Sequence, residues 1–352
     1  MTDNKKPLVV DLDGTLIKTD LLLESFMLLI KANPLNLVFV FLWLLKGKAN
    51  LKAEIARRVD ILVEVLPYNE AVVDYLKQQK KAGRTIVLAT ASHQRYAHGI
   101  ADYLKLFDDV LSSSDTLNLS GMAKRKALID RFGEGQYAYA GNADVDLKVW
   151  SHAGSAVVVG NDRLARKAGA LCDIEASFAV ASPSLRTIVK ALRVHQWVKN
   201  ALIFVPLITS HQLQSLDVLL MSVLGFFAFS LCASSVYFLN DLLDLSDDRQ
   251  HATKRNRPFA AGTLSLLFGI VGTPLLLLVA IVACLFLPTD FQIVLAVYYV
   301  LTLAYSFKLK RLVMVDVVTL ASLYTVRIVA GAAAIGVFLS FWLLSFSIFV
   351  FL

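Results

Sequence analysis

Short apolar runs alternate with helical patterns along the first half of the chain. The runs are residues 8–12 (LVVDL), 85–89 (TIVLA), 137–141 (YAYAG) and 155–160 (SAVVVG). Strands that alternate with helices predict a parallel, doubly wound α/β sheet of the Rossmann type. The polar sequences DLDGT, TAS and GNADVD each follow a strand, so we expect them at the carboxyl edge of the sheet, where such sheets place their sites.

The segment between the first two strands, about residues 20–80, has a helical pattern and predicts a helical cap. It contains the apolar run Leu37–Leu45, which is shorter than the roughly 20 residues that a membrane-crossing helix requires. We expect this run to be a buried helix of the cap. Contact with a membrane surface, helped by Trp43, Lys46 and Lys48, is the alternative.

Beyond residue 181 the pattern changes to long apolar stretches. We predict membrane spans near residues 200–212, 217–239, 263–287, 291–307, 313–336 and 339–352. This divides the chain into a soluble α/β domain at 1–180 and an all-α membrane domain at 181–352. Because the last apolar stretch ends without a polar or basic residue, we interpret the chain as a piece of a longer protein.

Composition agrees with this division. The 352 residues are 57% hydrophobic and 18% charged, whereas a soluble domain is about 45–50% apolar and about 25% charged. This excludes a wholly soluble enzyme. The net charge is +7, and basic residues gather in two loops between predicted spans, which indicates a cytoplasmic side rather than nucleic-acid binding. We therefore expect an integral protein of a bacterial-type inner or plasma membrane, with the N-terminal domain in the cytoplasm. The basic loop residues are Arg249, Lys254, Arg255, Arg257, Lys308, Lys310 and Arg311.

Asp11 and Asp13 follow the first strand and can reach one pocket beyond its end. One carboxylate can attack phosphorus while the other handles the proton of the leaving group. Gly14 permits a tight turn and Thr15 can donate to a phosphate. A Mg²⁺ ion would offset the repulsion between carboxylate and phosphate.

The DLDGT sequence resembles the first motif of the haloacid dehalogenase (HAD) superfamily, and the resemblance covers about residues 6–180. It implies a phosphatase in which Asp11 forms an aspartyl-phosphate and Asp13 is the general acid and base. It also implies that Thr90 in VLATAS and Lys124 in AKRKAL hold the phosphoryl group, with Lys126 as the alternative to Lys124.

The HAD resemblance implies Mg²⁺ ligands as well, namely Asp11, Asp13, Asn142 and Asp146. The family usually has Asp where this chain has Asn142, and Asp144 is the residue that could compensate for the lost charge. The alternative reading is a HAD fold without activity.

The second predicted span is followed by NDLLDLSDDRQHATKRNRP at residues 240–258. On a helix, this spacing places Asp241, Asp244 and Asp248 on one face. Three carboxylates on one face repel each other unless a cation lies between them, and hard oxygen ligands favour Mg²⁺ with a diphosphate. Lys254 and Arg257 follow and suit phosphate oxygens. A solvated loop of mixed charge is the alternative.

This stretch resembles the first aspartate-rich motif of the UbiA superfamily of membrane prenyltransferases, over about residues 190–352. LRVHQWVKN (192–200) resembles the entry to that family's first membrane helix, and YSFKLKR (305–311) resembles its tyrosine-lysine loop. HATKRNRP and HQWVKN most resemble the decaprenyl-phosphate phosphoribosyltransferase branch. The family carries a second aspartate-rich motif after its sixth helix, so we expect residues 1–352 to hold the first six spans only and to be inactive alone.

The UbiA resemblance implies Mg²⁺-dependent transfer of a phosphoribosyl group from a diphosphate donor to a polyprenyl phosphate. It implies that Asp241, Asp244 and Asp248 act on the donor, and that phosphate groups or substrate contact Lys199, Asn240, Lys254, Arg257, Tyr305, Lys310 and Arg311.

Two ionisable residues lie within a predicted span, Asp316 and Arg327. Because such groups are costly in a membrane, both are candidates to face the substrate cavity. A helix N-terminal charge is the alternative for Asp316, and a structural partner of another span is the alternative for Arg327.

Three other functions compete with phosphoribosyl transfer: prenyl transfer to an aromatic acceptor, a membrane-anchored HAD phosphatase with non-catalytic helices, and a non-enzymatic lipid-binding or transport protein. A tether needs no carboxylates, so the aspartate spacing favours a transferase. The fused phosphatase could then remove the 5-phosphate of the product.

Overall fold

The computed structural model describes residues 6–309 and 312–352. They form two compact units. The N-terminal unit is Met1–Ser184 together with Leu243–Leu266, and the membrane unit is Leu185–Leu242 together with Leu267–Leu352. The segment that follows the second predicted span, with most of the aspartate-rich motif, therefore belongs to the N-terminal unit.

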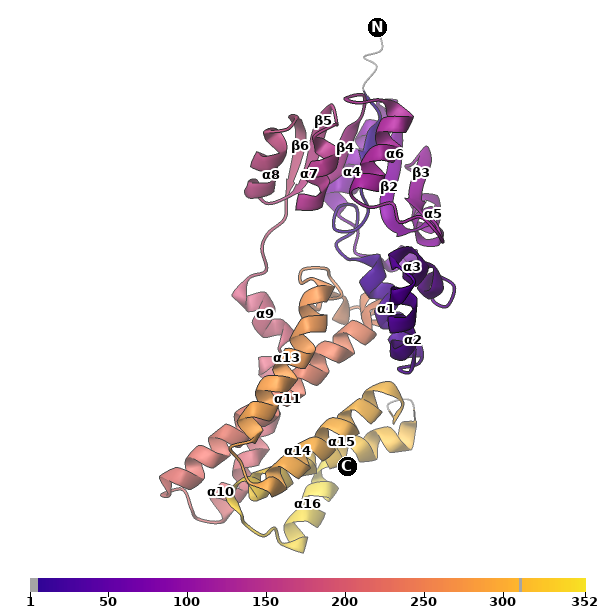
Figure 1. Ribbon diagram of the computed structural model, residues 1–352. Helices are drawn as coiled ribbons and strands as arrows, with labels where there is room; N and C mark the ends of the chain where they lie inside the picture. The colour runs from indigo at the N-terminus through magenta and orange to yellow at the C-terminus, as the bar shows by residue number, and fades with distance from the viewer. Residues whose placement is uncertain (1–5, 310–311) are drawn as a thin grey trace. The chain divides into compact units, whose positions relative to one another are not determined.

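The N-terminal unit is built on a parallel sheet of six strands in the order β3-β2-β1-β4-β5-β6. This confirms the predicted doubly wound sheet. The sequence pattern missed β3 and β6, which lie at the two edges and carry polar residues in place of a continuous apolar run (Figure 1). The strands are β1 (Leu8–Val10), β2 (Ile86–His93), β3 (Asp109–Ser113), β4 (Ala138–Gly141), β5 (Ser155–Gly160) and β6 (Asp173–Ala179).

Successive residues of β1 point to opposite faces of the sheet. Leu8 and Val10 pack into one apolar core, and Val9 packs into the other. The helices of the unit, in chain order, are α1 (Leu21–Ala32), α2 (Asn36–Leu45), α3 (Lys48–Ala56), η1 (Val63–Val65), α4 (Glu70–Lys81), α5 (Gln94–Leu104), α6 (Met122–Phe132), η2 (Asp144–Asp146), α7 (Leu147–Trp150), α8 (Asp162–Gly169), α12 (Leu245–Gln250) and η4 (Lys254–Asn256). Helices α4 and α5 pack on the first core, and α6, α7 and α8 pack on the second.

The cap comprises α1, α2 and α3, inserted between β1 and β2 as predicted. The expectation of a buried helix at Leu37–Leu45 was wrong. No residue of α2 is buried, and its large apolar side chains are mostly exposed. Only Val40 and Trp43 pack against the small apolar core between the cap helices.

The membrane unit is helical throughout. Its elements are α9 (Leu185–Ala191), η3 (Val194–Phe204), α10 (Val205–Thr209), α11 (Leu216–Leu243), α13 (Leu266–Cys284), α14 (Thr289–Phe307), α15 (Val313–Ile335) and α16 (Phe341–Phe351). Four helices in the described part of the chain are long and apolar enough to cross a membrane, namely Leu216–Leu243, Leu266–Cys284, Thr289–Phe307 and Met314–Ile335. The chain is thus an integral membrane protein.

Two of the predicted spans differ from the structure. The stretch 200–212 is not one helix, because η3 and the five-residue α10 occupy it and Pro206 lies in the first turn of α10. The stretch 339–352 contains α16, which has 11 residues.

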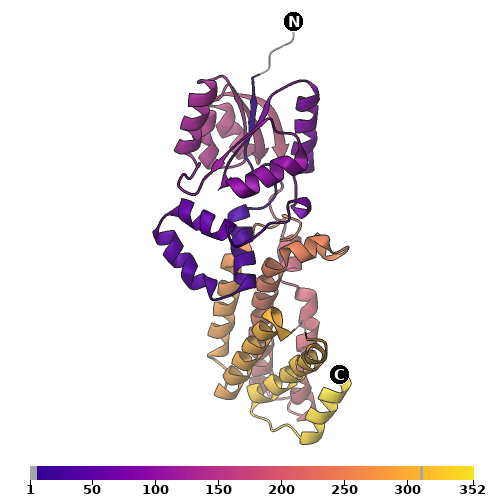
Figure 2. The ribbon, with the colours of Figure 1, turned by 90° about the vertical axis from the view of Figure 1, so that its right-hand side faces the viewer.

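Small residues allow close packing inside the membrane unit. A Cβ atom added to Gly331 of α15 would lie 2.1 Å from the carbonyl oxygen of Ile203, so only glycine permits this approach of α15 to η3. Helices α14 and α15 lie side by side (Figures 1 and 2). Phe229 of α11 and Tyr298 of α14 bring their ring centroids within 4.2 Å. This packing creates the walls of the cavity described below.

Candidate functional site

A cavity of about 350 Å³ lies at the carboxyl ends of β1, β2 and β4. The loop after β1 supplies Asp11 and Asp13, α6 supplies Lys124, and the loop after β4 supplies Asn142 and Asp146. The structure thus brings these five predicted site residues together. The cap adds Lys52 from α3, which the sequence pattern did not identify.

Lys124 is the centre of a hydrogen-bond chain on the floor of this cavity. Its Nζ donates to Asp11 Oδ1 at 2.7 Å and to Tyr139 Oη at 3.1 Å. The Tyr139 hydroxyl donates to Asp146 Oδ1 at 2.9 Å, and Asp146 Oδ2 accepts the backbone N–H groups of Asn142 and Ala143, each at 3.0 Å. Lys124 therefore holds a positive charge beside the predicted nucleophile, while Lys126 is exposed.

Asp13 is held by two donors, the Leu21 backbone N–H at 2.8 Å and the Ser92 hydroxyl at 2.6 Å. Burial, together with the negative charge of Asp20, raises the pKa of Asp13 to about 7. Burial and the charge of Asp11 raise the pKa of Asp146 to about 6. A carboxyl group that carries a proton near neutral pH suits the general acid role predicted for Asp13.

The predicted hydroxyl of the second motif lies elsewhere. Thr90 is fully buried, and its Oγ1 accepts the Ser92 backbone N–H at 2.9 Å. Thr90 does not line the cavity, whereas Ser92 does. The two hydroxyls stand two residues apart in TAS, and a regular strand would point both to the same face. Strand β2 has a register irregularity between Ala89 and His93, so only Ser92 faces the cavity.

Asn142 lies where Gly14 leaves room for it. Gly14 has φ of +75°, and a Cβ atom there would lie 2.1 Å from Asn142 Nδ2. The Thr15 hydroxyl donates to Asn142 Oδ1 at 3.1 Å. Asn142 lines both this cavity and a second one.

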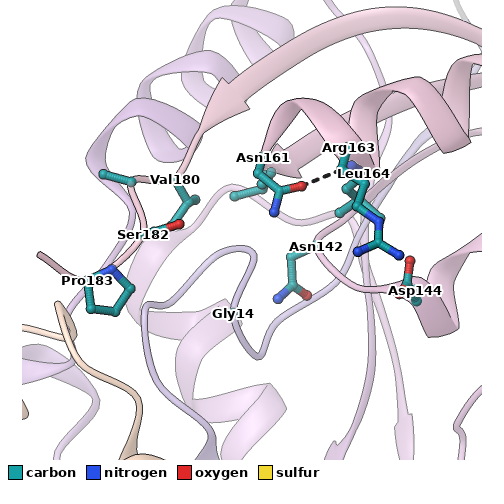
Figure 3. Close-up of a pocket in the computed structure, with 12 residues that line it drawn as sticks. Gly14, Asn142, Asp144, Asn161, Arg163, Leu164, Val180, Ser182 and Pro183 are labelled. Carbon is teal, nitrogen blue, oxygen red and sulfur yellow. Dashed lines mark hydrogen bonds between the residues drawn. The ribbon is translucent and has the colours of Figure 1, made fainter.

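The second cavity, of about 400 Å³, lies beyond Asn142 beside the N-terminus of α8 (Figure 3). Asp144 lines this cavity and not the one that contains Asp11, and its carboxylate pairs with Lys167 at 2.7 Å. The lysine hydrogen bond lowers the pKa of Asp144. Asp144 therefore does not replace the carboxylate that Asn142 lacks.

The oxygen donors of the first cavity are the type that Mg²⁺ prefers. Like-charge repulsion from Asp11 contributes to the raised pKa values of Asp13 and Asp146, and a bound cation would relieve it. Within residues 6–309 and 312–352, no three His, Cys, Asp or Glu side chains converge closely enough to form a metal site. The donors fit Mg²⁺ in kind, but Lys124 and the backbone N–H groups now occupy their oxygens.

The aspartate-rich motif does not form the single helix face that its spacing predicts. Helix α11 ends at Leu243, and Asp244 has φ of −103° and ψ of 19° before α12 begins. Each carboxylate has a cationic partner. In the membrane unit, Asp241 pairs with Arg193. In the N-terminal unit, Asp244 pairs with Lys31 at 2.9 Å.

Asp248 is buried and accepts two hydrogen bonds from Arg257 Nη1, at 2.9 and 2.7 Å. Burial raises its pKa, and Arg257 opposes that effect. Lys254 is exposed. The predicted phosphate ligands Lys310 and Arg311 lie outside the described residues.

A buried ion pair holds the segment Leu243–Leu266 within the N-terminal unit. Arg249 donates to both carboxylate oxygens of Glu24 on α1, at 2.6 and 3.0 Å, and its Nε donates to the Ala260 carbonyl at 2.9 Å. Both side chains are at most 5% exposed. Lys31 of the same helix contacts Asp247 as well as Asp244. Helix α12 is therefore held against α1 by these ion pairs.

The membrane unit encloses a cavity of about 240 Å³ between η3, α11, α14 and α15. Four predicted substrate residues line it, and the sequence pattern missed one cation and three aromatic residues. The predicted residues are Lys199, Asn240, Tyr305 and Arg327; the missed ones are Arg193, Tyr237, Tyr298 and Tyr324. The Asn240 Oδ1 atom is buried without a hydrogen-bond partner in the described residues, which marks an unfilled polar position.

Arg327 is buried and is surrounded by Phe229, Tyr298 and Tyr324, each with its ring centroid 5.4–5.5 Å from the guanidinium carbon. Its Nε donates to Asn200 Oδ1 at 2.8 Å. Arg327 thus lines the cavity and also bonds another helical segment, as both interpretations of this residue require. Asp316 does not line the cavity; it lies in the first turn of α15 and accepts the Tyr305 hydroxyl at 2.7 Å.

Comparison with known proteins agrees with this architecture. The family model for the UbiA prenyltransferase family matches residues 201–352, and the model for haloacid dehalogenase-like hydrolases matches residues 8–147. The chain is 39% identical to the uncharacterized protein y4nM of Sinorhizobium fredii over 354 residues, which cover 99% of this chain and 68% of that protein.

The chain is also 35% identical over 161 residues to decaprenyl-phosphate phosphoribosyltransferase of Mycobacterium tuberculosis, covering 45% of this chain and 53% of that protein. A solved structure of a UbiA homolog from Archaeoglobus fulgidus bound to DMAPP and Mg²⁺ aligns with a TM-score of 0.39 and 18% identity. It covers 47% of this chain and 59% of that one.

The parallel sheet with its Asp11 cavity and the apolar helices around the Arg327 cavity define a membrane protein with a fused phosphatase-like domain. The chain belongs to the UbiA prenyltransferase family and carries a haloacid dehalogenase-like domain ahead of its UbiA region. It spans about half the length of the phosphoribosyltransferases that it matches.

Proposed function

We propose that the membrane unit transfers a phosphoribosyl group from phosphoribosyl pyrophosphate to a polyprenyl phosphate. The observation that carries this proposal is the cavity with three cationic side chains, Arg193, Lys199 and Arg327, among apolar helices. Such a cavity suits anionic phosphate groups attached to an apolar chain. The similarity to decaprenyl-phosphate phosphoribosyltransferase supports this choice of substrates.

In this reaction an oxygen of the lipid phosphate attacks the anomeric carbon, and the bond from that carbon to the diphosphate breaks. The cationic side chains bind the phosphate oxygens, and the orphaned Asn240 Oδ1 accepts a hydroxyl of the sugar. Mg²⁺, when bound, would neutralise the departing diphosphate, and within the membrane unit Asp241, next to Asn240 in the sequence, is the carboxylate that could hold it. Its present partner, Arg193, neutralises this carboxylate without the metal.

The same proposal gives the N-terminal unit a phosphatase role. The Asp11 carboxylate attacks phosphorus, the ester P–O bond breaks, and Asp13 gives its proton to the departing alcohol; water then hydrolyses the aspartyl-phosphate with Asp13 as base. Lys124 beside Asp11 binds the phosphoryl oxygens. Mg²⁺, if held by Asp11, Asp13 and Asp146, would offset the charge of the phosphate. The substrate is the 5-phosphate of the product lipid. The N-terminal unit lies on the cytoplasmic side of the membrane, because its segment Leu243–Leu266 contains Arg249, Lys254, Arg255 and Arg257.

The first test uses the full-length gene product in bacterial membranes, because residues 1–352 alone are expected to be inactive, with labelled phosphoribosyl pyrophosphate, a polyprenyl phosphate and Mg²⁺. Wild type should form a labelled product that extracts into organic solvent, and Asp241→Ala should not. Asp290→Ala, at an exposed first-turn aspartate of α14, is the matched control and should keep activity.

No lipid product with wild type would refute phosphoribosyl transfer and favour prenyl transfer to an aromatic acceptor. The phosphatase step has its own test. Asp11→Asn should make the 5-phosphorylated lipid accumulate, whereas Asp144→Asn should not. Equal product profiles in both variants would refute the coupling of the two domains.

A further inference from the structure

Helix α2 turns most of its apolar surface away from the protein. Leu45 is 85% exposed, Phe41 67% and Val38 63%, and no residue of the helix is buried. Val40 and Trp43, one turn apart, form its only contact with the apolar core of the cap. In Figure 1, α2 is the cap helix drawn farthest from the sheet. A contiguous apolar patch of this kind on a soluble domain marks an interaction surface.

The chemistry around α2 selects a lipid bilayer as the occupant. Asn36–Leu45 carries no charge, and exposed Lys46 and Lys48 follow it directly. Trp43 is half-buried against the cap core, with the guanidinium carbon of Arg58 4.5 Å from its ring centroid, while Phe39 and Phe41 are exposed. Apolar, aromatic and lysine side chains in this order are typical of helices at the membrane–water boundary.

The dimensions of α2 exclude a span. Ten residues of helix extend about 15 Å, roughly half the thickness of the hydrocarbon core. The helix therefore lies in the interface. The same chain contains four membrane-spanning candidates, so a bilayer is always close and the local concentration of lipid surface is high.

We propose that α2 is an interfacial membrane helix that docks the haloacid dehalogenase-like domain onto the bilayer that holds the spans. Its apolar face enters the boundary between head groups and acyl chains, and Lys46 and Lys48 bind anionic head groups. Because α3 of the same cap supplies Lys52 to the catalytic cavity, this docking brings that cavity next to lipid head groups. The proposal is independent of the reaction assigned to either unit.

The test is the depth of a spin label in proteoliposomes of phosphatidylethanolamine and phosphatidylglycerol. The intact protein carries Cys172→Ser, and Phe41→Cys takes the label; Cys232 and Cys284 are buried. We expect oxygen to relax the label more strongly than a water-soluble nickel chelate does, at a depth of roughly 5–10 Å below the phosphates. A second label at Leu45→Cys should give the same order of accessibility.

Leu171→Cys is the matched control. Leu171 is 45% exposed and apolar, and it lies just before the amino end of the edge strand β6, whereas the cap follows the carboxyl end of the central strand β1. Its label should be relaxed more strongly by the nickel chelate. Three results for the label at Phe41→Cys would overturn the proposal. The first is accessibility to the nickel chelate equal to that at Leu171→Cys. The others are low accessibility to both reagents, which indicates that protein covers α2, and dipolar broadening between labels, which indicates contact with a second copy of the chain.

Discussion

The contact between Glu24 and Arg249 links the HAD-like domain to the aspartate-rich segment, and it can be broken by one conservative substitution. Glu24→Gln keeps the shape of the side chain and removes its charge. Arg249 then remains buried opposite a neutral amide, with the Ala260 carbonyl as its other acceptor. Helix α12 has six residues, and a helix of that length does not persist without such contacts. We expect residues 245–262 to open locally.

Removal of one partner from a buried ion pair costs roughly 3–5 kcal/mol. Since about 1.4 kcal/mol corresponds to a factor of ten, a cost near 3 kcal/mol should accelerate amide exchange of the opened segment by about 100-fold. The assay is hydrogen exchange of residues 245–262 in the intact protein.

Glu175→Gln is the matched control. Glu175 pairs with the buried Arg84 in the same unit, away from the segment Leu243–Leu266. It should lower thermal stability without faster exchange at residues 245–262. If Glu24→Gln exchanges this segment no faster than Glu175→Gln does, the ion pair does not hold α12 and the reasoning fails.

Three further predictions concern the cavity that contains Asp11 and the cavity of the membrane unit. Lys124→Met should lower phosphatase kcat/KM by about 100-fold or more, because its cation lies 2.7 Å from Asp11, whereas the exposed Lys126→Met should change it little in the same assay. Burial raises the pKa of Asp13 from 3.8 to about 7, so ionisation of Asp13 lowers the stability of the folded protein as the pH rises through that interval. In EDTA, Asp13→Asn should therefore raise the Tm more at pH 8 than at pH 5. An equal rise in Tm at both pH values would contradict the raised pKa. Arg327→Met should raise the KM for the lipid phosphate or abolish lipid product, while an unchanged KM and kcat would leave Arg327 with only its bond to Asn200.

The arrangement of the N-terminal unit was largely predictable from sequence. Apolar runs that end in DLDGT and GNADVD mark parallel strands, and polar residues just past such strands meet at one edge because all strands run the same way. Asp11, Asp13, Lys124 and Asp146 accordingly line one cavity. The sequence pattern did not predict the edge strands β3 and β6, because they are partly exposed and carry polar residues.

The arrangement of the aspartate-rich motif depends on tertiary contacts that the local sequence pattern does not reveal. The period of a helix predicts that Asp241, Asp244 and Asp248 share one face. The helix is interrupted at Asp244, however, where Lys31 of α1 pairs with the carboxylate. That lysine lies 213 positions earlier, as 244 minus 31 gives, so no local signal connects the two residues.

Apolarity by itself also does not determine burial. Leu37–Leu45 has the composition of a core helix, yet among the described residues only its Val40 and Trp43 pack into the apolar core of the cap. The sequence determined which side chains avoid water and which carry charge, because those are properties of single residues. Which neighbour covers an apolar helix or neutralises a carboxylate depends on residues distant in the chain, and only the folded structure brings these together.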